Sequence, residues 1–315
     1  MDLTIVIPNY ETRALLDGCL ALVAKASAEL PGMEIETIVV DNGSLDGSVA
    51  TARTSSCAPR VVALVRNRGF AAAVNRGLRL RKGRHVLLLN TDAEIDAAVL
   101  SGGVAILDRH PDVGALGVAL RHPDGRAQRS EHLLPGLATE LLPDPFVRTL
   151  RRRARVRSGG RDVEAVRGAV FFMNGDALKE MRALDEGYFF FLEETDYCAR
   201  LAAAGYRVQI IDGVHATHRL GASSKSRAPL ATRIEYHRSL YRYLEEHHGR
   251  AVAGLARGVR LLRNAIGCVA SIPFFVTSRY RSRLAQRWGL VLWHLRGCPT
   301  EPGLATELRR AARRE

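Results

Sequence analysis

Several features are scarce in this 315-residue sequence, and each scarcity narrows the kinds of protein it can encode. Only five cysteines are present, an odd number without Cys-x-x-Cys spacing, which favours free thiols in a reducing compartment. No apolar run approaches the roughly 20 residues that a membrane-spanning helix needs. Because Asp2 is followed directly by a strand-like run, we predict no secretory signal peptide and expect a cytoplasmic protein.

Acidic residues are scarce relative to basic ones. The chain has 46 Lys and Arg against 33 Asp and Glu, a formal net charge of +13 at pH 7. Such a surface attracts nucleic acid, anionic lipid headgroups or phosphorylated small molecules. Nucleic-acid binding is the weakest of the three interpretations, because zinc-ligand spacing, an RNA-recognition strand pattern and a clear helix-turn-helix are missing from the sequence.

What the sequence does contain is an alternation of β-branched runs and helical stretches in its first half. Residues 3–7, 35–40, 61–65 and 86–89 are strand-like, and residues 15–30 are typical of a helix. This alternation predicts an α/β fold with a mostly parallel central sheet flanked by helices. The ligand crevice of such a sheet lies beyond the carboxyl ends of its strands, where this sequence places Asn9, Asp41 and Asp92.

The alternation breaks over residues 120–165, where four prolines and an arginine-rich run predict a mobile or acceptor-side loop. It resumes with strand-like residues at 163–173 and 208–211. From about residue 230 we predict helices that mix Arg with apolar residues and contain few acids. Basic amphipathic helices of this kind lie on anionic membrane surfaces without spanning them. The alternative is a helical bundle that packs on the rest of the chain and keeps a solvated basic rim.

Three polar motifs at strand ends have both a chemical and a structural interpretation. Asp41, with Ser44 after it, can accept a hydrogen bond from a base or ribose hydroxyl, or can form a turn and cap the next helix. The small residues between Asn67 and Gly77 allow backbone N–H groups to approach a phosphate, or allow a helix to pack closely on the sheet. Asp92 can bind Mg²⁺ or Mn²⁺ together with phosphate oxygens and water, or can cap a helix that starts near residue 95.

Two further groups contain side chains suited to catalysis. Glu193, Glu194 and Asp196 lie close together beside an aromatic run, an expensive arrangement unless a metal, a proton or an arginine such as Arg200 compensates. One carboxylate could be a general base, or all three could be acids that stabilise a helix N-terminus. His218 could complete a metal site or bind a diphosphate, although a lone histidine is more often structural.

Taken in order, these segments resemble glycosyltransferase family 2, in particular its rhamnosyltransferase-like branch, from residue 3 to residue 224. The motifs that carry the resemblance in the first half are Val6-Ile7-Pro8-Asn9-Tyr10, Asp41-Asn42-Gly43-Ser44, the set Asn67, Gly69, Phe70, Asn75 and Gly77, and Asn90-Thr91-Asp92. Those in the second half are Gly168-Ala169-Val170, the run from Asp185 to Arg200, Gly205-Tyr206-Arg207-Val208, and His218 with Gly221 and Ser223. The run departs from the family in placing Glu194 where an Asp is usual, and Asn174-Gly175 replaces the family's Arg-Arg pair.

The resemblance implies the GT-A fold and a metal-dependent enzyme that inverts the anomeric carbon of a nucleotide-sugar donor. Glu194 would be the catalytic base, oriented by Asp196 or Arg200, and Asp92 with His218 would hold a divalent cation, Mg²⁺ or Mn²⁺. The donor would contact Pro8, Asn9, Tyr10, Asp41, Ser44, Asn67, Gly69, Phe70, Asn75, Asn90, Thr91 and Asp92. The acceptor side would include Gly168, Ala169, Glu193 and Arg200.

The resemblance also organises the chain and indicates its partners. It predicts a GT-A catalytic domain over residues 1–225, with a nucleotide-sugar-binding half at 1–95 and an acceptor and catalytic half at 96–225, followed by a basic helical extension at 226–315. We expect a dTDP- or UDP-sugar donor, with rhamnose as one candidate sugar. The acceptor would be a cell-envelope polysaccharide or a lipid-linked glycan, used in the cytoplasm or at the inner face of the plasma membrane. A non-catalytic nucleotide-sugar-binding protein is the alternative, and the oligomeric state, a homodimer included, stays open.

Overall fold

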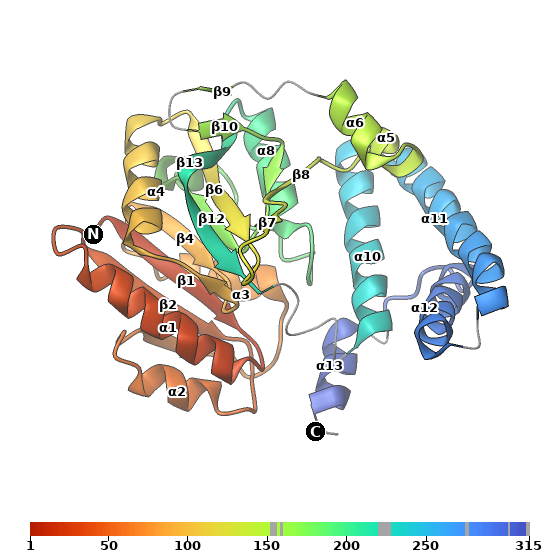
Figure 1. Ribbon diagram of the computed structural model, residues 1–315, viewed down its shortest axis with the longest axis horizontal. Helices are drawn as coiled ribbons and strands as arrows, with labels where there is room; N and C mark the ends of the chain where they lie inside the picture. Colours follow the sequence, from red (N-terminus) through yellow and green to blue (C-terminus); the bar gives the residue numbers. More distant parts are fainter. Residues whose placement is uncertain (152–155, 158–159, 220–227, 275–276, 302, 313–315) are drawn as a thin grey trace. The chain divides into compact units, whose positions relative to one another are not determined.

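The computed structural model describes residues 1–151, 156–157, 160–219, 228–274, 277–301 and 303–312 (Figure 1). Its contacts divide the chain into two compact units. Unit 1 comprises Met1–Leu134, Arg153–Phe189 and Glu193–Ala222, and unit 2 comprises Pro135–Arg152, Phe190–Leu192 and Ser223–Glu315. The domain boundary at residue 225 stays a prediction.

Eleven strands among the described residues of unit 1 form one sheet. Its longer strands are β1 (Leu3–Asn9), β2 (Ile35–Asp41), β3 (Arg60–Ala63), β4 (His85–Leu89), β6 (Val113–Arg121), β12 (Val170–Met173) and β13 (Arg207–His218). Its shorter strands are β5 (Ala93–Glu94), β7 (Ala127–Gln128), β9 (Val156–Arg157) and β10 (Gly160–Asp162). A separate pair is formed by β8 (Glu131–His132) and β11 (Ala165–Val166).

The sheet is mostly parallel, as the sequence predicts. The order along its main path is β3-β2-β1-β4-β12-β6-β13-β10-β9. The strands β3, β2, β1 and β4 are parallel neighbours, and β6 is parallel to β13. Between these groups β12 runs antiparallel to both β4 and β6. This reversal brings the first residues of β12 to the edge where β4 ends.

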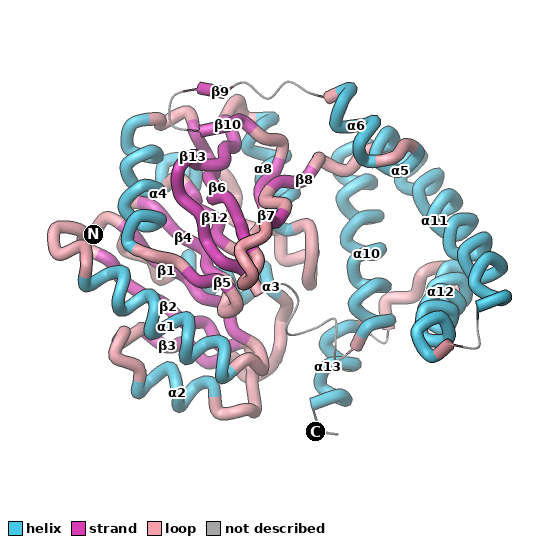
Figure 2. Tube along the Cα trace, in the orientation of Figure 1, coloured by secondary structure: helices cyan, strands magenta, loops and turns pink. Residues whose placement is uncertain are grey.

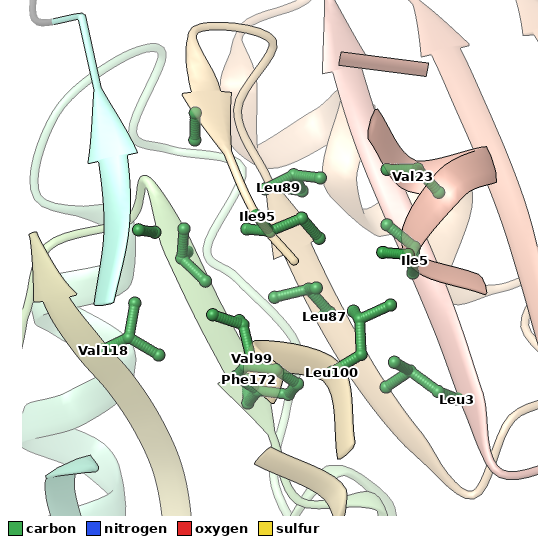
Figure 3. Packing of buried hydrophobic residues seen from close by; sticks show 14 of the residues in the cluster. Leu3, Ile5, Val23, Leu87, Leu89, Ile95, Val99, Leu100, Val118 and Phe172 are labelled. Atoms are coloured by element: carbon green, nitrogen blue, oxygen red, sulfur yellow. The ribbon is translucent and has the colours of Figure 1, made fainter. Parts of the chain in front are cut away.

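Helices cover both faces of this sheet, so its central strands are buried on both sides and are continuously hydrophobic in sequence (Figure 2). Leu3, Ile5 and Leu87 point to one face, as Figure 3 shows, and pack there with residues of α1 (Arg13–Ala28) and α4 (Ala97–Arg109). The alternate residues point to the other face, toward α3 (Phe70–Leu78), α7 (Gly175–Glu180) and α8 (Glu193–Ala203). The short α2 (Ser48–Thr54) contributes Ala52 to the first face.

All the regular elements in the described part of unit 2 are helices, which confirms the predicted C-terminal helices. The elements are α5 (Leu137–Leu141), α6 (Asp144–Leu150), α10 (Pro229–His248), α11 (Arg250–Ser271), the 3-10 helix η1 (Ile272–Phe274), α12 (Ser278–Leu295) and α13 (Leu304–Ala312). The long helices α10, α11 and α12 contact one another, and α5 contacts α11. None of the helices that the structure describes has the length and apolar character needed to cross a membrane.

The structure corrects the predicted elements in three places. Residues 120–165 contain β7, β8, β10, α5 and α6 where the sequence predicts a loop, because short elements separated by proline carry little periodic signal. The third strand ends at Ala63, opposite Asp41 of β2, and Val65 is fully exposed. The strand predicted at 208–211 continues to His218, because β13 passes an irregularity after Ile211 and pairs again with β6.

The close approach of α3 to β1 gives the first testable prediction. A Cβ on Gly77 would lie 2.5 Å from Cγ1 of Val6, whereas a Cβ on the exposed Gly18 of α1 would meet nothing within 4 Å. We expect Gly77→Ala to lower the free energy of unfolding by about 1–3 kcal/mol. Gly18→Ala, the control, should be neutral or stabilise by up to about 1 kcal/mol. Urea denaturation measures both, and equal effects of the two variants would contradict the packing.

Candidate active site

The candidate site begins where β1 and β2 end side by side. Asn9 is the register partner of Asp41, and its Nδ2 donates to Asp41 Oδ2 at 2.8 Å. Asp41 is only 1% exposed, and its Oδ1 accepts hydrogen bonds from the backbone N–H groups of Gly43 and Ser44. Asp41 therefore forms the turn that the sequence offered as the structural alternative. Its contact with a donor nucleoside stays a prediction.

Three more residues predicted to contact the donor, Pro8, Tyr10 and Ser44, lie beside Asn9 and Asp41. Ser44 Oγ accepts from the backbone N–H of Glu11 at 2.9 Å and from Asn9 Nδ2 at 3.3 Å. Pro8 and Tyr10 flank Asn9 and are half-buried. The strand end and the turn are thus joined by side-chain hydrogen bonds, which fixes the backbone that the predicted donor residues would present.

The loop from Asn67 to Phe70 is held by asparagine side chains. Asn42 Nδ2 donates to Asn67 Oδ1 and to the carbonyl of Gly69, both at 3.0 Å, and Asn67 Oδ1 also accepts from Gly69 N. Gly69 has a φ of 95°, and a Cβ there would lie 2.6 Å from the carbonyl oxygen of Phe189. Glycine is therefore required by the backbone at this position, and Phe70 N donates to the same carbonyl at 2.8 Å.

Asn75, which the sequence assigns to the donor, has a structural role in this fold. The residue is buried, its Nδ2 donates to the carbonyl of Leu184 at 2.8 Å, and its Oδ1 accepts from Leu184 N at 3.1 Å. Nδ2 also contacts Glu186 Oε1 at 3.1 Å. These bonds tie α3 to the segment that precedes α8, so Asn75 positions the site. A direct contact between Asn75 and a donor stays a prediction.

The sheet brings together Asp92 and His218, the two residues predicted to hold a metal. Strand β5 follows Asp92 and pairs with the end of β13, where His218 is the register partner of Ala93. His218 Nε2 consequently lies 3.3 Å from Asp92 Oδ1. The histidine side chain is 6% exposed and that of the aspartate is 14% exposed, so the pair is largely shielded from water.

The orientation of the His218 ring is set by Gln128, which sequence analysis missed. Gln128 Oε1 lies 2.7 Å from His218 Nδ1, and Gln128 Nε2 donates to the His218 carbonyl at 3.3 Å. Because an amide oxygen only accepts, Nδ1 is the nitrogen that carries the proton. A neutral His218 then presents the lone pair of Nε2 to the Asp92 carboxylate. Two acceptors at this separation need a proton or a cation between them.

Asp92 does not cap the helix that follows it, so the interpretation of Asp92 as a helix cap is wrong. That helix, α4, begins at Ala97, and Asp96 caps it by accepting from Val99 N at 2.9 Å. The turn before Asp92 is held by its neighbours. Thr91 Oγ1 lies 3.1 Å from Thr12 Oγ1, and Thr12 Oγ1 donates to Asn9 Oδ1 at 2.7 Å. Hydrogen bonds thus connect Asp41 to the Asp92 turn through Asn9.

Glu194 lies in the first turn of α8, with one carboxylate oxygen held and the other unpaired. Its Oε1 accepts from the backbone N–H of Gly168 at 3.2 Å, and a Cβ on Gly168 would lie 2.7 Å from that oxygen. Oε2 is buried and has no hydrogen-bond partner among the described residues. Burial raises the pKa of the Glu194 carboxyl above its ordinary value, and the positive charge of Arg167 opposes this shift only in part.

The backbone beside Gly168 connects Glu194 to the Asp92 turn. Ala169 follows Gly168, and its carbonyl accepts from the N–H of Asn90 at 3.0 Å. One peptide strand therefore contacts Glu194 through Gly168 and the Asn90-Thr91-Asp92 turn through Ala169. Hydrogen bonds and the intervening backbone therefore connect the residues at positions 41, 92 and 194, which are predicted to share a ligand, within unit 1.

The remaining acids of α8 are buried. Asp196 Oδ2 accepts from Arg200 Nε at 2.8 Å, and the other nitrogens of Arg200 donate to the carbonyls of Arg182 and Ala183. Arg200 thereby ties α8 to the segment before it. Glu193 is 2% exposed. Catalytic or acceptor roles for Asp196, Arg200 and Glu193 stay predictions, and Gly221 and Ser223 lie outside the described residues.

The number and type of side-chain ligands limit the kind of cation that this site could bind. Within the described ranges, no group of three or more His, Cys, Asp or Glu side chains could hold a metal ion. Asp92 and His218 therefore supply at most two ligands. That donor set fits a divalent ion whose other ligands are phosphate oxygens and water, since Mg²⁺ sites of this kind use one or two carboxylates. Imidazole nitrogen suits transition metals better than Mg²⁺.

Sequence comparison then assigns the family. The model of Glycosyl transferase family 2 matches residues 4–180, more than half of the chain. The chain belongs to glycosyltransferase family 2. Every donor-side motif of the family that was identified in the sequence falls within this matched range.

Individual relatives of this family 2 protein are known by sequence. The N-acetylglucosaminyl-diphospho-decaprenol L-rhamnosyltransferase of Mycobacterium tuberculosis is 26% identical over 267 residues, which are 78% of this chain and 85% of that protein. A dolichyl-phosphate beta-glucosyltransferase of Drosophila melanogaster is 33% identical over 101 residues, 29% of this chain and 31% of that one.

A solved structure confirms the GT-A fold of the family 2 chain. The mannosyltransferase of Pyrobaculum calidifontis, determined in complex with GDP-Man and Mn²⁺, superimposes with a TM-score of 0.58. The alignment covers 93% of this chain and 86% of that one at 18% sequence identity. At this level of identity the likeness concerns the fold.

The burial of Glu194 predicts how stability depends on pH. Because the pKa of Glu194 is raised in the folded state, the folded protein binds the proton more tightly than the unfolded chain. Stability due to this group therefore falls as pH rises from the ordinary glutamate range through the raised pKa. We expect Glu194→Gln to have a higher Tm than the wild type at about pH 8 and a smaller advantage at about pH 5. Calorimetry at both values measures this.

The exposed Glu29 provides the matched control for this measurement. Glu29→Gln changes the same functional group without burial, so its Tm difference from the wild type should be small and nearly independent of pH. A Glu194→Gln advantage that does not grow with pH would show that the carboxylate is not held in a desolvated state.

Proposed function

We propose that this chain is an inverting glycosyltransferase that transfers a sugar from a nucleotide-sugar donor to a lipid-linked acceptor. The observation that carries the proposal is the unpaired, buried Oε2 of Glu194, linked through Gly168 and Ala169 to the turn that presents Asp92. A base and a diphosphate-side carboxylate at one edge of the sheet are the two functions that an inverting transfer needs.

Glu194 acts as the general base in this proposal. Oε1 stays on the Gly168 N–H, and Oε2 accepts the proton of the acceptor hydroxyl as its oxygen attacks the anomeric carbon. The bond from that carbon to the diphosphate breaks on the opposite side, so the configuration inverts. The raised pKa makes Glu194 a stronger base than an exposed carboxylate, because burial disfavours its ionised form.

Asp92 and His218 hold a divalent cation in the proposal, Mg²⁺ or Mn²⁺. Gln128 keeps the proton on His218 Nδ1 and so leaves Nε2 free to bind. When bound, the cation neutralises negative charge on the leaving diphosphate. The mannosyltransferase that shares the fold was determined with Mn²⁺, which supports the proposal of a divalent cation.

The donor occupies the ends of β1 and β2 in the proposal, with Asp41 toward the nucleoside. A dTDP- or UDP-sugar is favoured, and rhamnose is the candidate sugar because the Mycobacterium tuberculosis relative is a rhamnosyltransferase. Diphospho-decaprenol in that relative and dolichyl phosphate in the Drosophila melanogaster enzyme are both polyprenyl carriers, which supports a lipid-linked acceptor. Action on such an acceptor would place the protein at the inner face of the plasma membrane, with its basic helices toward the lipid.

The first test measures transfer with substitutions at position 194. We expect Glu194→Gln to reduce the transfer rate by about 10²–10⁴-fold, because amide nitrogen and oxygen cannot remove the acceptor proton. Glu194→Asp keeps a carboxylate one methylene further back and should retain part of the activity. Transfer from labelled dTDP-rhamnose and UDP-sugars to polyprenyl-diphosphate glycans measures both variants. Wild-type rates in Glu194→Gln would exclude Glu194 as the base.

The same assay separates the alternative of a non-catalytic nucleotide-sugar-binding protein. That alternative predicts stabilisation by nucleotide sugars in thermal shift, since a ligand stabilises the state it binds, but no turnover with any acceptor. The proposed enzyme should show both. Glu194→Gln should still be stabilised by the donor, because the substitution leaves Asp41 and Asp92 unchanged.

The second test addresses the metal and the part that Gln128 plays. We expect Gln128→Leu to weaken Mn²⁺ binding in the presence of UDP by about 10–100-fold, because the His218 ring loses the partner that orients it. Asp92→Asn should weaken it further. Titration followed by the electron paramagnetic resonance signal of free Mn²⁺ measures the affinity without requiring turnover. Gln286→Leu in α12 is the control, and its affinity should equal that of the wild type.

A Gln128→Leu affinity equal to that of the wild type would show that the His218 ring needs no partner at Nδ1 to bind the cation. An Asp92→Asn affinity equal to that of the wild type would remove Asp92 from the metal site altogether. Circular dichroism spectra of both variants establish that the sheet is intact.

A further inference from the structure

Helix α11 of unit 2 turns small and polar residues inward and several aliphatic residues outward, the opposite of a helix that packs on a hydrophobic core. The residues that it buries are largely small or polar: Ala253, Ala256, Asn264, Cys268 and Ser271. A helix that packs on a protein core normally turns its apolar face inward. The inward face of α11 therefore does not account for four of the large aliphatic residues in its sequence.

Those aliphatic residues lie on the outward face. Leu255 is 48% exposed, Leu262 60%, Ile266 59% and Val269 68%. Their spacings of seven, four and three residues place all four on one side of a helix. Along four turns, α11 thus presents a continuous apolar stripe to the outside of unit 2.

The inward face is fixed by ionic and polar contacts, so the helix cannot simply rotate. Arg260 forms a bidentate pair with Glu140 of α5, at 2.7 and 2.9 Å, and the Glu140 side chain is 4% exposed. Arg287 of α12 donates to Ser271 Oγ at 3.0 Å. Turning α11 to bury Leu262 would break both contacts and would leave the Glu140 carboxylate buried without its arginine, which is costly.

Exposed apolar residues also lie on α5, which contacts α11, and on α6, which contacts α5. Figure 1 shows these helices beside one end of α11, and Arg263 of α11 reaches the carbonyl of Leu141 at 3.5 Å. Leu141 is 46% exposed, Phe146 53% and Leu150 65%. Of the fifteen large hydrophobic side chains that the described chain exposes, twelve belong to unit 2. Exposed apolar residues gathered in this way mark an interaction surface.

Charge identifies the partner of this surface. Unit 2 contains 21 Lys and Arg against eight Asp and Glu, whereas unit 1 contains 25 of each, so unit 2 carries the entire net charge of +13. Between residues 247 and 300 there are nine arginines and neither Asp nor Glu. A second copy of this chain would bring two such units together with few acids to pair the arginines. An anionic surface is complementary to the arginines and also accepts the apolar stripe.

We propose that the outward face of α11, extended by the exposed residues of α5 and α6, docks on an anionic lipid bilayer. The stripe enters the boundary between headgroups and acyl chains, and the arginines of unit 2 contact lipid phosphates. Use of the docked state to reach a lipid-linked acceptor rests on the proposed function. The docking itself does not, because it requires neither the donor nor the residues at the end of the sheet.

The test is sedimentation of the full chain with vesicles, without donor or acceptor. We expect the wild type to bind phosphatidylglycerol vesicles at low salt, to bind less at high salt, and to bind phosphatidylcholine vesicles weakly. Leu262→Gln combined with Ile266→Gln should lower the partition coefficient for anionic vesicles by about 10–100-fold, because two side chains no longer enter the apolar layer. Both residues are exposed, so folding should be unaffected, and circular dichroism checks it.

The matched control replaces two exposed apolar residues of unit 1, Leu45→Gln with Val65→Gln, and should bind vesicles like the wild type. Two results would overturn the proposal. One is equal vesicle binding by the α11 variant and the wild type. The other is a wild-type dimer in light scattering that the α11 variant loses, which would make a second copy the occupant of the stripe. Donor-induced thermal shift, measured separately, reports on the proposed function and is independent of either result.

Discussion

The antiparallel direction of β12 is the constraint on which the candidate site depends. Because β12 runs against β4, its first residues lie beside the last residues of β4. This places the Ala169 carbonyl on Asn90 N at 3.0 Å and leaves the preceding Gly168 N–H to bind Glu194 Oε1. A parallel β12 would start at the opposite edge of the sheet and would separate Glu194 from Asp92 by the length of a strand. The missing Cβ of Gly168 is part of the same constraint, since it would lie 2.7 Å from the carboxylate oxygen.

Much of the fold could be predicted from the sequence, because the hydrophobic pattern of each segment agrees with its place in the sheet. The strands that start the sheet are runs of β-branched and aliphatic residues, buried on both faces, and the polar residues that follow them mark one edge. What the sequence could not give are contacts set by register between distant segments. His218 reaches Asp92 only through the pairing of β5 with β13, and Gln128 reaches His218 from a segment whose prolines predicted a loop.

For several polar residues the sequence allows both a ligand-binding role and a structural role, and the structure distinguishes the two. The sequence offers Asp92 as a cap for the helix that starts near residue 95, but the hydrogen bond from Val99 N to Asp96 assigns the cap to Asp96 and leaves Asp92 without that role. The opposite holds for Asp41 and Asn75, whose side chains form hydrogen bonds with backbone groups of the protein. Such residues can hold a site in shape without touching a ligand. Asn9 and Asn42, at the ends of two neighbouring strands, likewise bond to the turn and the loop beside them.

The distribution of charge bears on how the chain would hold a diphosphate. Unit 1 has as many acids as bases, and three of those acids, Asp41, Asp92 and Glu194, belong to the candidate site. A diphosphate brought to this edge meets carboxylates of its own sign. A divalent cation beside Asp92 and His218 would reverse the local sign, since a bound ion is the largest charge in its site. In the proposed mechanism this reversal of sign is the electrostatic role of the cation in binding the leaving group. The excess positive charge is left in unit 2, where it is available to lipid phosphates.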